Sequence, residues 1–133
     1  DNLTDITGMT CSTTPTSSSS KILIMPSMSC SGDSWAVFFR VLRGSTVVSL
    51  GDDAGGNRSR STFSGGYADN RDGIQTATWN YLDSPSTTSS TTYKIQGAGR
   101  SSGDWAINRS KQNQNYSWTF SAVSTLTLME IAA

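Results

Sequence analysis

The most informative absence in this sequence is histidine, of which the chain contains none. Without it the chain lacks the commonest general base, the commonest metal ligand and every Ser-His or Cys-His nucleophile system. Glutamate occurs only at Glu130, so a mechanism with paired carboxylates would depend on aspartates. The aspartates lie beside turn-forming residues, where backbone capping accounts for them: Asp52, Asp53, Asp69, Asp72, Asp83 and Asp104. The sequence therefore predicts that the chain is not an enzyme.

Long apolar runs and an excess of either charge are also missing. No apolar stretch approaches the roughly 20 residues of a membrane span, and the N-terminus lacks the basic and apolar segments of a signal peptide. Ten basic and ten acidic residues cancel, and neither sign forms a long block. We therefore expect no membrane insertion and no nucleic-acid partner. Because the chain begins at Asp1 rather than Met, we expect it to be the C-terminal part of a longer protein.

Cysteine is scarce, and the metal-binding signals are weak. The spacing of Cys11 and Cys30 matches no metal motif, so we expect two reduced, packed side chains, with a single disulfide as the alternative. Residues 51–57 could bind calcium through Asp52, Asp53 and Asn57, but their pattern is not that of an EF-hand. A glycine-rich connection explains this segment better, and we expect neither a metal nor a cofactor.

Serine and threonine are abundant, with 24 and 17 residues, and they separate short runs of β-branched and aromatic residues. Within these runs apolar and polar residues alternate with the period of two that is typical of a half-buried strand. The pattern predicts strands near residues 3–13, 21–30, 34–42, 45–50, 59–64, 73–82, 91–97, 103–108, 116–120 and 122–131. We expect a single all-β domain over residues 1–133, an antiparallel two-sheet β-sandwich of jelly-roll type.

Proline is rare as well, but Pro26 falls inside an apolar run that is predicted to be a strand. A proline cannot donate a hydrogen bond to a neighbouring strand, so it is found at sheet edges or at bulges. We therefore expect the strand around Pro26 to lie at an edge or to carry a bulge.

The strands predicted over residues 34–42 and 122–131 are apolar on both faces. Because no helix is expected to cover the second face, we predict a homotrimer, with cover by a long loop of the same chain as the alternative. The predicted interface residues are Phe38, Arg40, Leu126, Leu128 and Glu130. In the assembly we expect Glu130 to pair with Arg40, Arg43 or Lys21, whereas the alternative is an exposed glutamate.

Aromatic and arginine side chains in or beside loops are the candidate binding residues, because flat rings and guanidinium groups suit sugar rings and acidic glycans. The candidates are Arg58, Arg60, Tyr67, Arg71, Trp105, Tyr116 and Trp118. For each of them, packing against the end of the sandwich is the alternative. By contrast, Trp35, Trp79 and Tyr93 lie within predicted strands and are assigned to the core.

The order of several short segments resembles a known class of protein. The segments are Thr13-Thr14-Pro15 with the serine run and Lys21-Ile22-Leu23-Ile24, Tyr81-Leu82-Asp83-Ser84-Pro85, Thr92-Tyr93-Lys94, Ile107-Asn108-Arg109-Ser110, and Ser124-Thr125-Leu126-Thr127-Leu128-Met129-Glu130-Ile131. Together they resemble the C-terminal domains of tail-fibre-like and other structural proteins of tailed phages, especially marine and cyanobacterial ones. The resemblance implies a jelly-roll trimer on a virion, and it transfers no individual binding residue.

These observations lead us to expect a non-enzymatic virion protein that is assembled in the host cytoplasm and then carried on the extracellular particle. The leading hypothesis is an exposed fibre-tip domain that binds a host-surface receptor, either a glycan or a protein. The alternative is a capsid decoration, or cement, protein that binds phage capsid proteins. A third hypothesis is a carbohydrate-binding module attached to an enzyme.

Overall fold

The computed structural model describes residues 2–32, 35–68, 71–99 and 105–132. These residues form ten β-strands and no helix, so none of them belongs to a helix that could span a membrane. The strands are β1 (Thr4–Thr13), β2 (Lys21–Gly32), β3 (Trp35–Arg43), β4 (Thr46–Val48), β5 (Phe63–Ala68), β6 (Gln75–Thr78), β7 (Tyr81–Asp83), β8 (Thr91–Ala98), β9 (Trp105–Ile107) and β10 (Thr125–Ile131).

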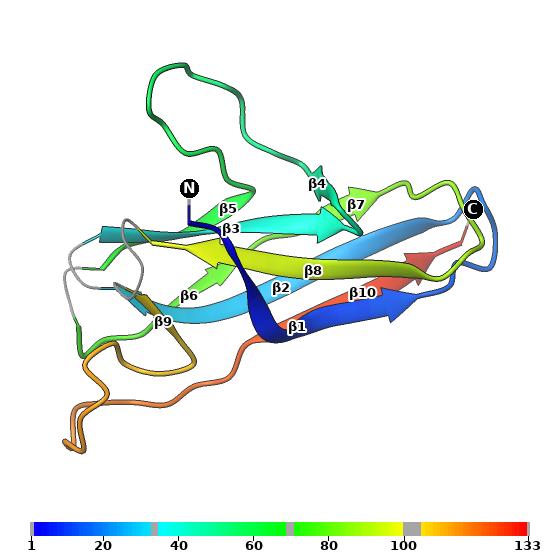
Figure 1. Ribbon diagram of the computed structural model, residues 1–133. Coiled ribbons are helices and arrows are strands. Elements are labelled where there is room, and N and C mark those ends of the chain that lie inside the picture. The colour runs from blue at the N-terminus through cyan, green and yellow to red at the C-terminus, as the bar shows by residue number, and fades with distance from the viewer. Residues whose placement is uncertain (1, 33–34, 69–70, 100–104, 133) are drawn as a thin grey trace.

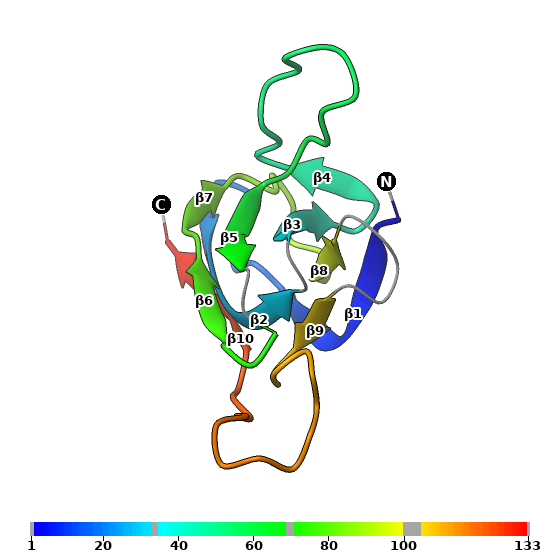
Figure 2. The same cartoon turned by 90° about the vertical axis from the view of Figure 1, so that its left-hand side faces the viewer.

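The strands form two antiparallel sheets that face each other (Figures 1 and 2). The first sheet has the order β1-β8-β3, and both β4 and β5 pair with the remaining edge of β3. In the second sheet β2 is central, with β9 and β10 along one edge and β6 and β7 along the other. This arrangement confirms the expected all-β, antiparallel two-sheet sandwich.

Most strands lie where the alternation of the sequence places them, with three exceptions. Residues 116–120 form no strand, because they belong to a long loop. The strand predicted over residues 73–82 is divided into β6 and β7, and β5 begins only at Phe63, near the end of its predicted range.

Pro26 explains the division between β6 and β7. The registers of β2 with these two strands are continuous and place Pro26 opposite Trp79. The Trp79 N–H donates to the Pro26 carbonyl at 3.4 Å, but proline has no N–H to return the second bond of the pair. The expected edge position of this strand is wrong, because β2 is the central strand of its sheet. Its proline instead interrupts the neighbouring strand between β6 and β7.

The core lies between the sheets and follows the inward-facing residues of β2, β3 and β8. Nine of these side chains are at most 2 % exposed: Ile22, Ile24, Met28, Cys30, Val37, Phe39, Val41, Tyr93 and Ile95. Burying a large aliphatic side chain contributes about 1.5–3 kcal/mol, so this set is a major source of hydrophobic stabilisation. Cys11 and Cys30 are both free thiols. Burial raises the pKa of the Cys30 thiol to about 11, which keeps it protonated near neutral pH.

A row of aromatic rings connects the two sheets along one side of the sandwich. The ring centroid of Phe63 lies 5.0 Å from that of Phe39 and 6.1 Å from that of Trp79, and Trp79 stacks on Tyr81 at 5.3 Å. The row runs from the fully buried Phe39 in the first sheet to the partly exposed Tyr81 in the second. Trp79 therefore packs against the core as predicted, whereas the side chain of Trp35 lies outside the described part.

A polar cluster around Asp83 also joins the sheets. Tyr93 Oη, on β8, donates to Asp83 Oδ2 at 2.7 Å, and Arg43 Nη1, on β3, donates to the same oxygen at 2.6 Å. Burial and the hydrogen bond to Asp83 raise the pKa of Tyr93 well above its ordinary value. Since Asp83 is almost fully buried, the bonds from Tyr93 and Arg43 satisfy a carboxylate that would otherwise be costly to bury.

Glu130 is satisfied by the loop that follows β1. Its Oε1 accepts hydrogen bonds from the Thr16 hydroxyl and the Thr16 N–H, both at 2.7 Å. These bonds, the hydroxyl first, hold the pKa of the Glu130 carboxyl below its ordinary value. In the single chain Glu130 therefore has Thr16 as its partner, and its pairing with Arg40, Arg43 or Lys21 in an assembly stays a prediction.

The last strand turns different residues outward from those predicted to form an interface. Leu126 and Leu128 face inward and pack against the core, whereas Met129 and Ile131 face outward and are 50 % and 40 % exposed. Met129 lies opposite Leu23 of β2, so the outward apolar surface continues onto the central strand. Leu126 and Leu128 are thus on the buried side of β10.

The outer face of β3 is partly covered by the chain itself. Phe38 is half-buried and Leu42 is buried. Arg40 Nε donates to the carbonyl of Arg60 at 2.8 Å, which fixes the base of a long loop over this strand. At Arg40 a loop of the same chain therefore covers the outer face of β3, and the Arg40 side chain is already bonded within the chain.

Candidate functional site

Two long loops interrupt edge strands, one in each sheet. Residues 49–62, here called loop 49–62, separate β4 from β5 beside β3. Residues 108–124, here called loop 108–124, separate β9 from β10 beside β2. Figure 2 shows them protruding from opposite sides of the sandwich. They are the longest loops among the described residues, and both extend beyond the two sheets.

Ser29 on the central strand β2 holds both ends of loop 108–124. Its carbonyl accepts from the Asn108 N–H at 2.9 Å, and its own N–H donates to Ser124 Oγ at 2.9 Å. The Ser29 hydroxyl donates to the Val123 carbonyl at 3.0 Å. The loop therefore leaves and re-enters the sheet at one fixed point.

The first part of loop 108–124 is ordered by a second buried serine, Ser110. Its N–H donates to the Phe120 carbonyl at 3.0 Å, and its hydroxyl oxygen accepts from the Phe120 N–H at 2.9 Å. The same hydroxyl donates to the Asp72 carbonyl, and Arg109 and Ser121 form an isolated antiparallel bridge. These bonds give the base of the loop a defined geometry without a regular strand.

Loop 108–124 exposes three aromatic side chains, Tyr116 and Trp118 near its tip and Phe120 near its base. Tyr116 and Trp118 stack with ring centroids 4.7 Å apart and an angle of 19° between the planes. Tyr116, Trp118 and Phe120 are 44 %, 54 % and 58 % exposed. Thr119 donates to the Tyr116 carbonyl from both its N–H and its hydroxyl, which holds the turn between the rings. Large aromatic rings presented together to solvent mark a binding surface.

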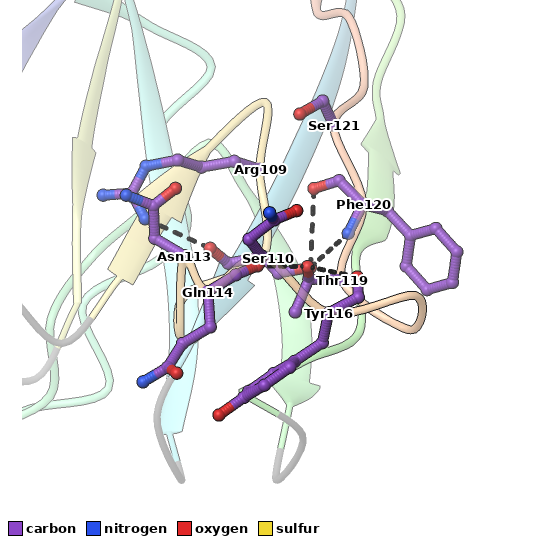
Figure 3. A pocket seen from close by; sticks show the side chains of 9 residues that line it. Arg109, Ser110, Asn113, Gln114, Tyr116, Thr119, Phe120 and Ser121 are labelled. Carbon is purple, nitrogen blue, oxygen red and sulfur yellow. Dashed lines mark hydrogen bonds between the residues drawn. The ribbon is translucent and has the colours of Figure 1, made fainter.

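A polar cavity of about 240 Å³ lies beside these rings (Figure 3). Hydroxyl and amide groups dominate its walls, which are formed by Arg109, Ser110, Asn113, Gln114, Asn115, Tyr116, Thr119, Phe120 and Ser121. In Figure 3 the amides of Asn113 and Gln114 lie on one side of Ser110, and the ring of Phe120 lies on the other. The site thus combines flat apolar surfaces with several donors and acceptors of hydrogen bonds.

The structure brings together two of the seven predicted binding residues, Tyr116 and Trp118. Arg71 borders the same loop, since its carbonyl accepts from the Gln112 N–H at 3.0 Å. Arg58 is exposed on the other loop, 49–62. These four predicted residues therefore lie on two separate surfaces.

The remaining candidates are structural or lie outside the described part. Trp105 is half-buried, and its ring lies so close to Gly97 that an added Cβ would be 3.0 Å from it. Arg60 Nε donates to the Gly51 carbonyl at 2.7 Å and closes the base of loop 49–62. Trp105 therefore packs against the first sheet, which was the alternative, and Arg60 has a structural role at the base of its loop. Tyr67 lies in β5, and its side chain is outside the described part.

The sequence interpretation missed Arg109, Asn113, Gln114 and Phe120. A signal was present, because four consecutive amide residues, 112–115, directly precede aromatic residues at every second position, 116, 118 and 120. The spacing of two also predicts a strand over residues 116–120. Residues 116–120 instead belong to a loop, and all three of its rings are exposed.

Loop 49–62 shows the turn chemistry expected of it. Asp53 Oδ1 accepts from the Gly55 N–H at 2.9 Å, and Gly55 and Gly56 both have positive φ, which favours glycine. Across the described ranges, no group of three or more histidine, cysteine, aspartate or glutamate side chains is placed to hold a metal ion.

The cavity and its rings are the part of the molecule in which binding chemistry is concentrated. No protein-family model and no curated protein matches this chain, so a functional assignment has to be built on the geometry of loop 108–124.

Proposed function

We propose that the chain is a non-enzymatic, exposed domain of a virion that binds a host-surface glycan through loop 108–124. The observation that carries this proposal is the solvent-exposed stack of Tyr116 and Trp118 beside a polar cavity. A sugar ring has flat apolar faces and hydroxyl groups around its edge. Aromatic rings accommodate the faces, and amides and hydroxyls bind the edge.

The cavity walls support binding rather than catalysis. The nine residues that form them include no carboxylate, thiol or imidazole side chain. Hydrolysis near neutral pH most often uses one of these groups as the general base within reach of the substrate. The walls therefore favour groups that orient a ligand over groups that would activate water.

The proposal includes the jelly-roll trimer and the virion location that the resemblance to phage structural proteins implies. An apolar surface on the second sheet supports a trimer. This outer apolar face consists of Leu23, Met25, Leu82, Met129 and Ile131, in which Leu23 lies opposite both Leu82 and Met129. Three copies of loop 108–124 on one trimer, and many trimers on one particle, raise the strength of attachment without a tight single site.

The direct test is binding of the purified domain to intact host bacteria and to a panel of immobilised polysaccharides. Trp118→Ala should reduce the affinity at least about tenfold, because a stacked aromatic ring contributes on the order of 1–3 kcal/mol to such contacts. Trp118→Phe retains a flat ring and should retain most of the binding. Binding that is the same for both variants and the unmodified chain would overturn the proposal, and binding to purified capsids alone would favour a decoration protein.

A further inference from the structure

Loop 108–124 carries a local excess of positive charge, although the chain as a whole is neutral. Ten basic and ten acidic residues cancel overall, yet no aspartate or glutamate occurs from Trp105 to Met129, the segment that contains Arg109 and Lys111. Within the described residues, neither cation is paired with a carboxylate. Asp72 touches the loop through its carbonyl oxygen, which accepts from Ser110.

Arg109 lines the cavity, and its guanidinium group is held in place at one nitrogen. Nη1 donates to the carbonyls of Ser110 and Lys111 at 3.1 and 3.4 Å. A guanidinium group has five N–H donors, so Nε and Nη2 keep donors for a ligand. A half-buried arginine that is already oriented loses less conformational freedom when it binds a carboxylate than a free one does.

Resting on the glycan-binding function above, we propose that the ligand is an acidic polysaccharide. The sugar ring stacks on Tyr116 or Trp118, and its carboxylate binds to Arg109, with Lys111 adding long-range attraction. The two oxygens of a carboxylate can accept the N–H groups of Nε and Nη2 as a pair of parallel hydrogen bonds.

Matched ligands test this specificity. The probes are immobilised polygalacturonate, alginate and hyaluronate, each compared with its methyl-esterified form, which has the same sugar rings without the charge. We expect the charged form of at least one polymer to bind about tenfold or more tightly than its ester. Raising the salt concentration should weaken only the charged interaction.

Matched variants locate the interaction. Arg109→Gln should abolish the preference for the charged polymer, while Arg58→Gln, which removes the same charge from loop 49–62, should leave it unchanged. Circular dichroism and melting temperature confirm that both variants are folded.

Three results would overturn the inference: equal binding of charged and esterified polymers, preference for sulfated or neutral polysaccharides, or the same effect from both arginine variants. If neutral polymers bind and depend on Trp118, the proposed glycan-binding function stands and only its acidic specificity fails. If no polysaccharide and no host cell binds, both fail together.

Discussion

Glu130 illustrates, at the scale of a single residue, how hydrogen bonds within the chain can satisfy a carboxylate for which an ion pair was predicted. The only glutamate, set among apolar residues, suggested a buried ion pair in an assembly. The loop after β1 instead brings two Thr16 donors to the carboxylate. Sequence alternation could not show this, because residues 16 and 130 meet only after both sheets have formed.

The pH dependence of stability tests the contact between Glu130 and Thr16. A carboxyl with a lowered pKa in the folded state stabilises the fold above its unfolded pKa, and that contribution disappears as the pH falls through the folded value. Glu130→Gln should lower the melting temperature at pH 7 by on the order of 1–2 °C, and the difference from the unmodified chain should shrink below about pH 4.

Asp52→Asn, which removes a charge from the exposed loop 49–62, is the control for this measurement and should not reproduce the pattern. A difference between Glu130→Gln and the unmodified chain that is constant from pH 7 to pH 3 would contradict a role for the ionised carboxylate.

At the scale of elements, β5 crosses unusually close to β2 at Gly65. A Cβ added to Gly65 would lie 2.5 Å from Cys30 Sγ, which is fixed in the core. Gly65→Ala should therefore reduce the free energy of unfolding by about 1–3 kcal/mol, as overpacked cores do, and chemical denaturation measures this loss.

Adding Cys30→Ala removes the sulfur that the new methyl group would meet. The double variant should therefore be about as stable as Cys30→Ala alone, so the two substitutions should not be additive. If Gly65→Ala alone leaves stability unchanged, the close approach of the two strands is incorrect.

The strands were predictable from the sequence where a local signal dominates. Alternation predicted the strands β2, β3 and β8 because a half-buried strand repeats every two residues, and Tyr93 lies in the core as expected. The sequence shows that Pro26 has no N–H to donate, but whether its strand lies at an edge depends on which strands pair with β2. Residues 116–120 alternate like a strand, yet the bonds of Ser110 to Phe120 close them into a loop.

At the scale of the whole molecule, the outer apolar face is the surface through which we expect the proposed trimer to form. Met129 belongs to this face, opposite Leu23 and 50 % exposed. We expect light scattering at micromolar concentration to give the mass of a trimer for the unmodified domain. Met129→Lys should give a folded monomer, because it places a charge in an apolar contact.

Val123→Lys is the matched control, because Val123 is 76 % exposed but lies on loop 108–124 rather than on the outer apolar face. A monomeric unmodified domain would contradict the trimer. Equal dissociation by both variants would contradict the location of the interface.

The binding site, like the strand that contains Pro26, was only partly predictable from the sequence. Tyr116 and Trp118 were identified from residue type and from their place beside loops, but the cavity needs Arg109 and Ser121 side by side, a pairing that depends on how the long loop folds back.

Each long loop begins and ends beside one interior strand, loop 108–124 beside β2 and loop 49–62 beside β3. Ser29 closes one of them, and Thr62 closes the other by accepting from the Val41 N–H and donating to the Val48 carbonyl, each at 3.2 Å. The loop segments between these hydrogen bonds can change in length and composition while the strand pairing of β2 and β3 is retained. The sandwich is therefore suited to serve as a display scaffold. New recognition surfaces could evolve by changes in either loop while the core residues stay the same.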